Sequence, residues 1–378
     1  ELISRLGFSF IAVEGDWPDC YLLNRYIKSY PDAGTTAREV LEGFSRWPTW
    51  MWANWEIVAL AEWMKLFNQS QQAGKTVGFY GLDVYSLWDS LTMMVNYLRK
   101  TDPPAYKKAL AALQCFEPFG QDEGQSYARA TLDEWLPASC EDEVLDLLMT
   151  VEDRLQHYNA DPEAMLNVGV NSNITVNAEK YYRAMVRGGP ESWNIRDRHM
   201  YSTLNRLMNF HGPAAKVIIW EHNTHIGDAR ATDMRLDGMI NLGQLLNEGN
   251  FREGVFSIGF GSYQGTVIAG RRWGDVMREM KLPPAQADSW EFILHQANAA
   301  NRLILFDAEW KNLLAMKELG HRAVGVVYNP QWEYGNYVPS ILPLRYDAFV
   351  FIDQTKALHP LHLKPDGHKI PETYPFGI

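Results

Sequence analysis

The sequence predicts an α/β fold: a three-layer α/β/α arrangement with a mostly parallel sheet and a large helical insertion that forms a cap. Short apolar runs rich in β-branched and aromatic residues recur along the chain, and amphipathic helical patterns separate many of them. One long stretch contains helical patterns alone. The chain has 378 residues, of which 46% are hydrophobic, and this globular composition excludes collagen-like, mucin-like and largely disordered proteins.

The apolar runs are the candidate strands. Most are nearly continuous rather than alternating, as expected of strands buried on both faces of a sheet. Helical patterns at residues 37–44 and 56–71 separate the first two runs, and patterns at residues 290–298 and 308–319 lie among the later ones. Residues 260–270, with three glycines, are expected to form a hairpin beside the main sheet. The candidate strands are residues 8–14, 76–83, 215–221, 254–260, 303–306, 323–328 and 348–352.

The stretch from residue 87 to residue 212 contains no convincing strand. Amphipathic helical patterns fill it, and prolines and a Gly-Gly-Pro turn separate them. We therefore predict an α/β core made of residues 1–86 and 213–378, with residues 87–212 inserted as a helical cap. The candidate helices of the cap are residues 90–100, 104–115, 126–135, 141–158, 176–187 and 196–210.

Charge and cysteine content narrow the class of protein. The chain carries 35 Lys and Arg against 46 Asp and Glu, a formal net charge of −11, which disfavours nucleic acid and anionic membrane surfaces as partners. No apolar run reaches the roughly 18 residues of a membrane span. Cys20, Cys115 and Cys140 are far apart and odd in number, which argues against a disulfide framework and against a thiolate metal site. We expect a cytoplasmic protein; the sequence does not indicate its oligomeric state.

The first residues have the pattern of a helix end. Leu2, Ile3 and Leu6 share one helical face, and Gly7 suits the position after a helix. No charged segment followed by an apolar segment is present, so these residues are not a signal peptide. We expect a further segment upstream of Glu1.

Polar residues follow the first three candidate strands. Ligands of open α/β sheets bind beyond the carboxyl ends of the strands, so these positions are the candidate site. Glu14 ends the first run and Asp16 lies just beyond it, Asp83 ends the second, and residues 221–225 (Glu-His-Asn-Thr-His) begin at the end of the third. Carboxylates and imidazoles gathered at one edge are costly unless they serve chemistry or pair with each other.

The most specific of these features is the histidine pair, His222 and His225. Histidine exchanges protons near neutral pH and binds metals, and two histidines leaving a buried strand can point into one cleft. The alternative is a pair of core histidines bonded to backbone carbonyls; we favour a functional role. Glu14 is a candidate to orient a histidine or activate water, or it caps the next helix with Asp16. Asp83 has the same two interpretations.

Aromatic and basic residues add weaker candidates. Three tryptophans fall within residues 47–52, where they either pack beneath the sheet or form an aromatic wall for an apolar substrate. Composition does not decide between these two roles. An inward-facing Arg196 would clamp an anion or a carbonyl group, whereas Asp197 in a first helical turn simply suits the helix dipole.

Several catalytic motifs are absent from the sequence. It has no Gly-x-Ser-x-Gly elbow, no Walker A loop, no Gly-x-Gly-x-x-Gly after the first strand and no His-Glu-x-x-His helix. An ordinary serine hydrolase is therefore unsupported. His359, His362 and His368 lie in a proline-rich tail, and we interpret them as surface or tail-packing residues.

Several motifs, in the same order, resemble the erythromycin esterase family, and the resemblance covers essentially the whole chain. They are residues 14–17, 44–52, 80–83, 195–200 and 220–225, and the tail from residue 328 to residue 378. The resemblance implies a three-layer α/β sheet with a helical cap over a deep cleft. It also implies hydrolysis of an ester or lactone, macrolide-like or other, by water that a Glu-held histidine activates without an obligatory metal. That histidine lies in a Gly-Glu-x-x-His-Gly stretch of the family, which this sequence lacks and which would precede residue 1.

The resemblance also suggests roles for individual residues. Glu14 resembles the strand-end carboxylate of the family, and His222 and His225 resemble its later histidine pair, which orients water or binds the developing oxyanion. These three are the expected catalytic residues, and no metal or cofactor is expected. The expected substrate-binding residues are Asp16, Trp17, Trp50, Trp52, Asp83, Tyr85, Arg196, Asp197 and Asn223.

Two alternatives remain open, because a fold does not fix a substrate. One is a metal-dependent hydrolase in which Glu14, His222 and His225 are the three ligands. The other is a non-catalytic protein of the same fold whose aromatic cleft binds a ligand such as haem. The metal content of the purified protein distinguishes the metal-dependent hydrolase from a metal-free one. A Soret band would indicate the haem-binding protein.

Overall fold

A computed structural model describes residues 1–71, 75–120, 124–133, 139–159, 161–249, 251 and 254–363 of the chain. The tail with His368 and the end of the predicted helix at residues 126–135 lie outside these residues. Two compact units make up the chain. Unit 1 comprises Glu1–Asn24, Val77–Trp220 and Asp237–Met239, and unit 2 comprises Arg25–Thr76, Glu221–Leu236 and Ile240–Ile378. These units do not coincide with the predicted core and cap, and that division stays a prediction.

Unit 1 contains a parallel sheet of three strands. They are β1 (Phe10–Asp16), β2 (Gly78–Asp83) and β3 (Val217–Trp220), in the order β2-β1-β3. The central strand β1 is buried at every residue, which explains its continuous apolar run. Val13 lies opposite both Gly81 and Trp220, so the three carboxyl ends meet at one edge. The first three predicted strands are confirmed.

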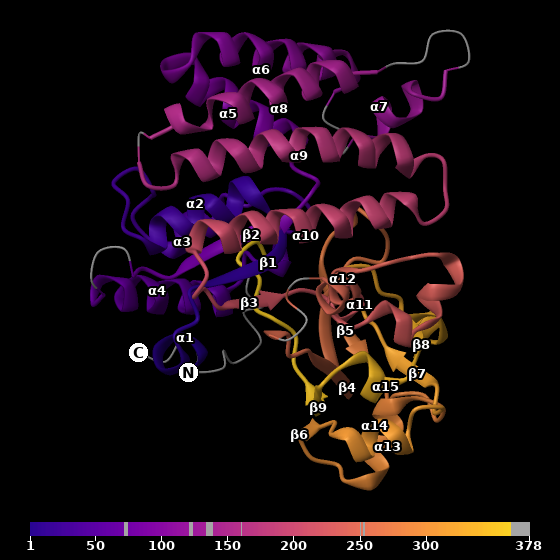
Figure 1. Cartoon of the computed structure of the whole chain (residues 1–378). Coiled ribbons are helices and arrows are strands. Elements are labelled where there is room, and N and C mark those ends of the chain that lie inside the picture. Colours follow the sequence, from indigo (N-terminus) through magenta and orange to yellow (C-terminus); the bar gives the residue numbers. More distant parts are fainter. Residues whose placement is uncertain are drawn as a thin grey trace. The chain divides into compact units, whose positions relative to one another are not determined.

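The helices of unit 1 follow these strands. No strand occurs in the described part of residues 87–212, as predicted, and the long helices α9 and α10 lie side by side (Figure 1). Helix α10 also packs against β2. The α-helices are α1 (Leu2–Leu6), α5 (Leu87–Thr101), α6 (Pro103–Phe116), α7 (Gln125–Ala130), α8 (Glu141–Arg154), α9 (Ala164–Met185) and α10 (Glu191–His211). Helix α2 (Trp17–Ile27) begins in unit 1 directly after β1.

Helix α9 is longer than the predicted helix at residues 176–187. It begins at Ala164, and most of its residues up to Val176 are buried, including the polar residues Asn171, Ser172 and Thr175. A helix buried on all sides has no alternation of polar and apolar faces, so the amphipathic pattern that marks a surface helix is missing here.

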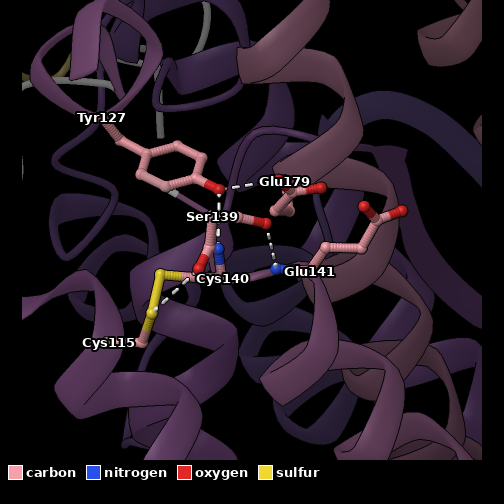
Figure 2. Close-up of a disulfide and its surroundings, with 6 residues drawn as sticks. All are labelled: Cys115, Tyr127, Ser139, Cys140, Glu141 and Glu179. Atoms are coloured by element: carbon pink, nitrogen blue, oxygen red, sulfur yellow. Dashed lines mark hydrogen bonds between the residues drawn. A yellow bond between two sulfur atoms is a disulfide. The ribbon is translucent and has the colours of Figure 1, made fainter. Parts of the chain in front are cut away.

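A disulfide joins two helices of unit 1, and it corrects the expectation drawn from the cysteines. Cys115 in the last turn of α6 is bonded to Cys140 at the start of α8, and Figure 2 shows the bridge. Beside it the Tyr127 hydroxyl donates to Glu179 Oε1 at 2.6 Å and accepts from the Cys140 amide at 3.0 Å. Cysteines 25 residues apart become neighbours because α6 packs on α8. Cys20 remains a buried thiol.

Unit 2 contains a mixed sheet and a small antiparallel pair. The strands are β4 (Ile258–Ala269), β5 (Arg278–Leu282), β6 (Arg302–Leu305), β7 (Leu319–Arg322), β8 (Tyr337–Ser340) and β9 (Ala348–Thr355). The larger sheet has the order β5-β4-β9-β6, in which only β4 and β9 are parallel, and β7 pairs with β8. The far half of β4 forms a hairpin with β5, so the predicted hairpin segment supplies one arm of it.

Two predictions for unit 2 are wrong in detail. Residues 323–328 form no strand, only a single bridge from Val327 to Gly270, and Val324 and Tyr328 pack beside the β4–β5 hairpin. The predicted helix at residues 308–319 ends at Leu313, and β7 begins at Leu319. The strand was missed because its sequence, Leu-Gly-His-Arg, is polar although its last two residues are buried.

The helices of unit 2 are mostly short, and side-chain caps begin several of them. Thr36, Asn54, Asn241 and Ser289 each accept a bond from an amide in the first turn. The α-helices are α3 (Ala37–Glu42), α4 (Trp55–Gln69), α11 (Asn223–Ile226), α12 (Leu242–Glu248), α13 (Trp290–Ala297), α14 (Ala308–Leu313) and α15 (Leu342–Arg345). Among the residues that the structure describes, no helix is long and apolar enough to cross a membrane. The α/β class with a helical insertion is confirmed.

Candidate functional site

Three carboxylates leave the sheet of unit 1 at the carboxyl ends of neighbouring strands. Glu14 and Asp16 end β1, Asp83 ends β2, and the register pairs Asp16 with Asp83. All three residues are buried, with at most 9% of their surface exposed. Gly81 allows this close approach, because a Cβ at that position would lie 2.3 Å from the Gly15 carbonyl oxygen.

Arg196 of α10 bonds two of these carboxylates. Its Nη2 lies 2.7 Å from Glu14 Oε1 and 2.7 Å from Asp83 Oδ2, and its Nε donates to Asp83 Oδ1 at 2.9 Å. Burial alone would lower the pKa of the Arg196 guanidinium, but Asp83, Tyr85 and Glu14 together raise it well above its ordinary value. The guanidinium is therefore a fixed cation between two carboxylates. Its side chain is only 11% exposed.

Tyrosines close one side of this cluster. The Tyr85 ring lies 4.9 Å from the Arg196 guanidinium carbon, a cation–π contact. The Tyr181 hydroxyl donates to the Tyr85 hydroxyl at 3.4 Å, and Tyr182 donates to the Tyr85 carbonyl at 2.7 Å. Burial raises the pKa of the Tyr85 phenol, so Tyr85 offers a neutral hydroxyl group at the strand edge.

His199, one turn beyond Arg196 on α10, was not among the predicted site residues. It is buried, Asn177 Nδ2 lies 3.1 Å from its Nδ1, and Thr203 Oγ1 lies 3.4 Å from its Nε2. Burial lowers the pKa of His199 to about 4 in spite of the charge on Asp83, so the ring is neutral near pH 7. The only sequence signal was its place in the Arg-Asp-Arg-His stretch.

The other predicted residues of unit 1 are buried in its interior. The Trp17 indole donates to Asn167 Oδ1 at 2.9 Å and stacks on Tyr80 with ring centres 5.6 Å apart. Asp197 is fully buried on α10. Trp17 is thus tied to helix α9, and its contact with a substrate stays a prediction, as do those of Asp16 and Asp197.

The predicted residues that follow β3 belong to unit 2. His222 precedes the one-turn helix α11 and accepts at Nδ1 from the Thr224 amide at 3.3 Å. Because an amide can only donate, Nε2 carries the ring proton and donates to the Val324 carbonyl at 3.1 Å. The imidazole of His222 is half-buried and oriented through both nitrogens, while His225 on α11 is buried.

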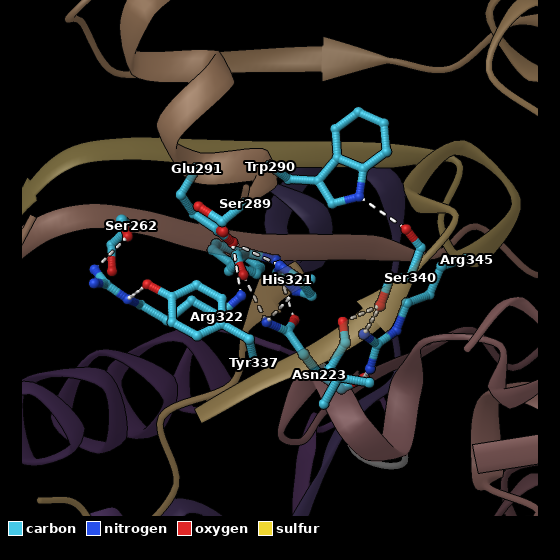
Figure 3. A network of polar contacts seen from close by, with 12 residues as sticks. Asn223, Ser262, Ser289, Trp290, Glu291, His321, Arg322, Tyr337, Ser340 and Arg345 are labelled. Carbon is cyan, nitrogen blue, oxygen red and sulfur yellow. Dashed lines mark hydrogen bonds and ion pairs between the residues drawn. The ribbon is translucent and has the colours of Figure 1, made fainter. Parts of the chain in front are cut away.

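Asn223 is anchored by its side chain to the strand β4. Its Oδ1 accepts from the Phe260 amide at 3.1 Å, and its Nδ2 donates to the Phe260 carbonyl at 2.6 Å. Its Nδ2 also lies 3.3 Å from His321 Nε2, as Figure 3 shows. The predicted contact of Asn223 with a substrate competes with these bonds and stays a prediction.

The predicted aromatic residues Trp50 and Trp52 also belong to unit 2. Trp50 lies in the 3-10 helix η1 (Thr49–Met51), and both side chains are buried. Trp47 packs edge-on against Trp50 at 5.3 Å and donates from its indole to the Asp275 carbonyl at 2.9 Å. These contacts are those of core packing, and an aromatic wall for a substrate stays a prediction.

The structure thus assembles the predicted residues in two groups, one in each unit. Glu14, Asp83, Tyr85 and Arg196 form the first, and His222, Asn223 and His225 form the second. Within the described ranges no cluster of three or more His, Cys, Asp or Glu side chains has the arrangement of a metal site. The metal-ligand set of Glu14 with the two histidines draws on both units and stays a prediction.

Comparisons with known proteins identify relatives of the chain. A family model described as erythromycin esterase matches residues 3–355. The chain is similar to a succinoglycan biosynthesis protein (18% identity, TM-score 0.70, covering 95% of this chain and 82% of that one). It is also similar to a protein from Bacillus cereus (16%, TM-score 0.72, 96% and 84%). A third similar structure is a mutant of the erythromycin esterase EreC in its open conformation (15%, TM-score 0.66, 95% and 85%). These identities are low, so the three structures show the shared fold alone.

Proposed function

Because the chain belongs to the erythromycin esterase family, we propose that it is a hydrolase that cleaves a small-molecule ester or lactone with activated water. The observation that carries the proposal is the buried Glu14–Arg196–Asp83 cluster at the carboxyl ends of β1 and β2. Removing three charged groups from water is costly, and proteins retain such clusters chiefly at functional sites or in structural ion-pair networks. The cluster lies at the carboxyl ends of the strands, and this position favours a functional site over a structural ion-pair network.

We assign separate roles to the residues of the cluster. Arg196 fixes the Glu14 carboxylate, because it donates a 2.7 Å bond to one oxygen of that carboxylate. A fixed carboxylate can orient a water molecule, or it can orient the base that removes a proton from that water. The water oxygen then attacks the ester carbonyl carbon, and the carbon–oxygen bond to the alcohol breaks as the alcohol oxygen takes up a proton.

His222 and His225 are proposed as further catalytic residues, on the strength of family membership. His222 carries its proton on Nε2, so it can donate a hydrogen bond to a developing negative charge. It would first have to release the Val324 carbonyl. His225 is proposed to support this turn, since it is buried within α11.

The substrate, the absence of a metal requirement and the cytoplasmic location are further parts of the proposal. A macrolide is one candidate among lactones, on the strength of family membership. The Cys115–Cys140 disulfide gives the cytoplasmic location no support, because disulfides persist mainly in oxidising compartments. Cell fractionation tests the location directly.

The test is hydrolysis in ¹⁸O-labelled water. The full chain is incubated with a panel of aryl esters, aliphatic lactones and erythromycin, with and without a chelator, and the products are identified by mass spectrometry. The proposal predicts that at least one member gives an acid carrying one ¹⁸O, with or without the chelator. Loss of turnover with the chelator would favour the metal-dependent alternative. If no ester or lactone is turned over and a chromophore co-purifies, the result would favour a non-catalytic protein that binds a ligand such as haem.

A further inference from the structure

A chain of hydrogen bonds in unit 2 reaches the turn that carries the histidine pair. It runs from Glu291 on α13 through His321 on β7 to Asn223 on α11, and Figure 3 shows its members. Glu291 Oε1 lies 2.6 Å from His321 Nδ1, and His321 Nε2 lies 3.3 Å from Asn223 Nδ2. From this geometry we infer that His321 is a positioning residue for His222. The inference rests on the proposed role of His222.

The direction of every bond in this chain is determined. The Phe260 amide donates to Asn223 Oδ1, so the Asn223 amide nitrogen must point at His321. His321 Nε2 is therefore an acceptor, and its proton lies on Nδ1, where it is donated to Glu291. These hydrogen bonds therefore have one consistent arrangement of donors and acceptors, and it requires a neutral His321.

The electrostatic surroundings of His321 keep it in that state. Its side chain and that of Glu291 are both fully buried. Burial lowers the pKa of His321, and nearby Arg345 acts in the same direction, although Glu291 opposes both. A second proton on Nε2 would face the Asn223 amide hydrogens, so protonation would break the chain at that bond.

Asn223 is also fixed from a second direction. Its carbonyl oxygen accepts from Arg345 Nη2 at 3.0 Å and from the Tyr346 hydroxyl at 3.3 Å. Helix α11 spans four residues, Asn223–Ile226, and a single turn has little stability of its own. Its orientation depends on these bonds, and His222, the residue before it, shares that dependence.

A pair of substitutions at one position separates positioning from simple packing. In His321→Asn the side-chain amide takes the place of Nδ1, so it can bond Glu291 but not Asn223. In His321→Gln it takes the place of Nε2, so its oxygen can still accept from Asn223. Asn223→Ala directly removes the bond between Asn223 and His321. Tyr337→Phe is the matched control: it removes bonds to Glu333, Arg322 and Gln286 in the same network without touching Asn223.

Steady-state kinetics on an ester cleaved by the wild type is the first measurement. Misplacing a reacting group by about 1 Å can cost roughly 100-fold, so we expect His321→Asn and Asn223→Ala to lower kcat by about 10- to 100-fold with KM nearly unchanged. His321→Gln and Tyr337→Phe should stay within about threefold per folded molecule. Equal losses in the Asn and Gln variants, or an equal loss in Tyr337→Phe, would overturn the inference.

Histidine side-chain NMR is the second measurement, and it needs no substrate. In the ¹⁵N-histidine-labelled full chain, His321 should show the Nδ1–H tautomer and His222 the Nε2–H tautomer. Asn223→Ala and His321→Asn should shift the His222 resonances, and Tyr337→Phe should leave them in place. Unchanged His222 resonances in Asn223→Ala would overturn the inference. If these shifts occur in a protein without esterase activity, the positioning stands and the proposed function alone fails.

Discussion

Replacing Arg196 by methionine tests whether the carboxylate cluster depends on its central cation. Methionine retains much of the side-chain length and removes the charge, so Glu14 and Asp83 are left buried and facing each other. Three bonds of 2.7, 2.7 and 2.9 Å are lost with the guanidinium. Charged hydrogen bonds contribute about 1.5–3 kcal/mol each but are not additive. Removing one partner of a buried ion pair costs about 3–5 kcal/mol, and we expect the free energy of unfolding to fall by about that amount.

Urea unfolding followed by tryptophan fluorescence measures this loss. The control is Lys108→Met in the same unit, which removes a 2.7 Å ion pair to Asp146 whose side chains are 45% and 51% exposed. An exposed pair contributes about 0–1 kcal/mol, so the control should be nearly neutral. In Arg196→Met, the additional change Asp83→Asn should restore part of the loss, because one of the two repelling charges is gone. A loss below about 1 kcal/mol in Arg196→Met, or no recovery in the double variant, would refute the reasoning.

Three further predictions concern stability. Cys115→Ser should lower the free energy of unfolding by about 3 kcal/mol, because the disulfide closes a loop between residues 25 apart, and dithiothreitol should reproduce the loss in the wild type but not in the variant. The depressed pKa of His199 means that the unfolded chain takes up a proton as pH falls from about 6.5 to about 4, so stability should fall over that window. His199→Gln should reduce this fall by about 1–2 kcal/mol between pH 7 and pH 5 in urea titrations, and an identical pH slope would contradict the assignment. Gly81→Ala should destabilise unit 1 and reduce ester turnover, because its Cβ would lie 2.3 Å from the Gly15 carbonyl, whereas Gly325→Ala, with no neighbour within 4 Å, should be neutral by the same assays.

The sequence predicted the parallel strands of unit 1 because burial has a direct signature there. The strand β1 is buried on both faces, and its apolar run is continuous for that reason. The ends of β1 and β2 then placed Glu14 and Asp83 at one edge. Their common partner, Arg196, lies 182 and 113 residues away in the sequence, and no local pattern encodes a contact of that range.

The features that the sequence did not predict depend on tertiary packing. The disulfide requires α6 and α8 to lie together, which cysteine spacing does not show. His321 and Arg322 are polar, yet both are buried because Glu291 and backbone carbonyls satisfy them. A buried polar strand such as β7 is visible only once its partners are known.

The central claim is that Glu14, held by Arg196, takes part in ester hydrolysis, and the most direct measurement compares two buried glutamates. Glu14→Gln and Glu179→Gln are isosteric changes in the same unit, and each removes a carboxylate that is bonded to an arginine. We measure kcat/KM for both variants on an ester that the wild type hydrolyses, and we normalise to folded protein by circular dichroism. Glu14→Gln should lose about 100-fold or more, and Glu179→Gln should stay within about threefold. Equal activity in the two variants would contradict the role of Glu14.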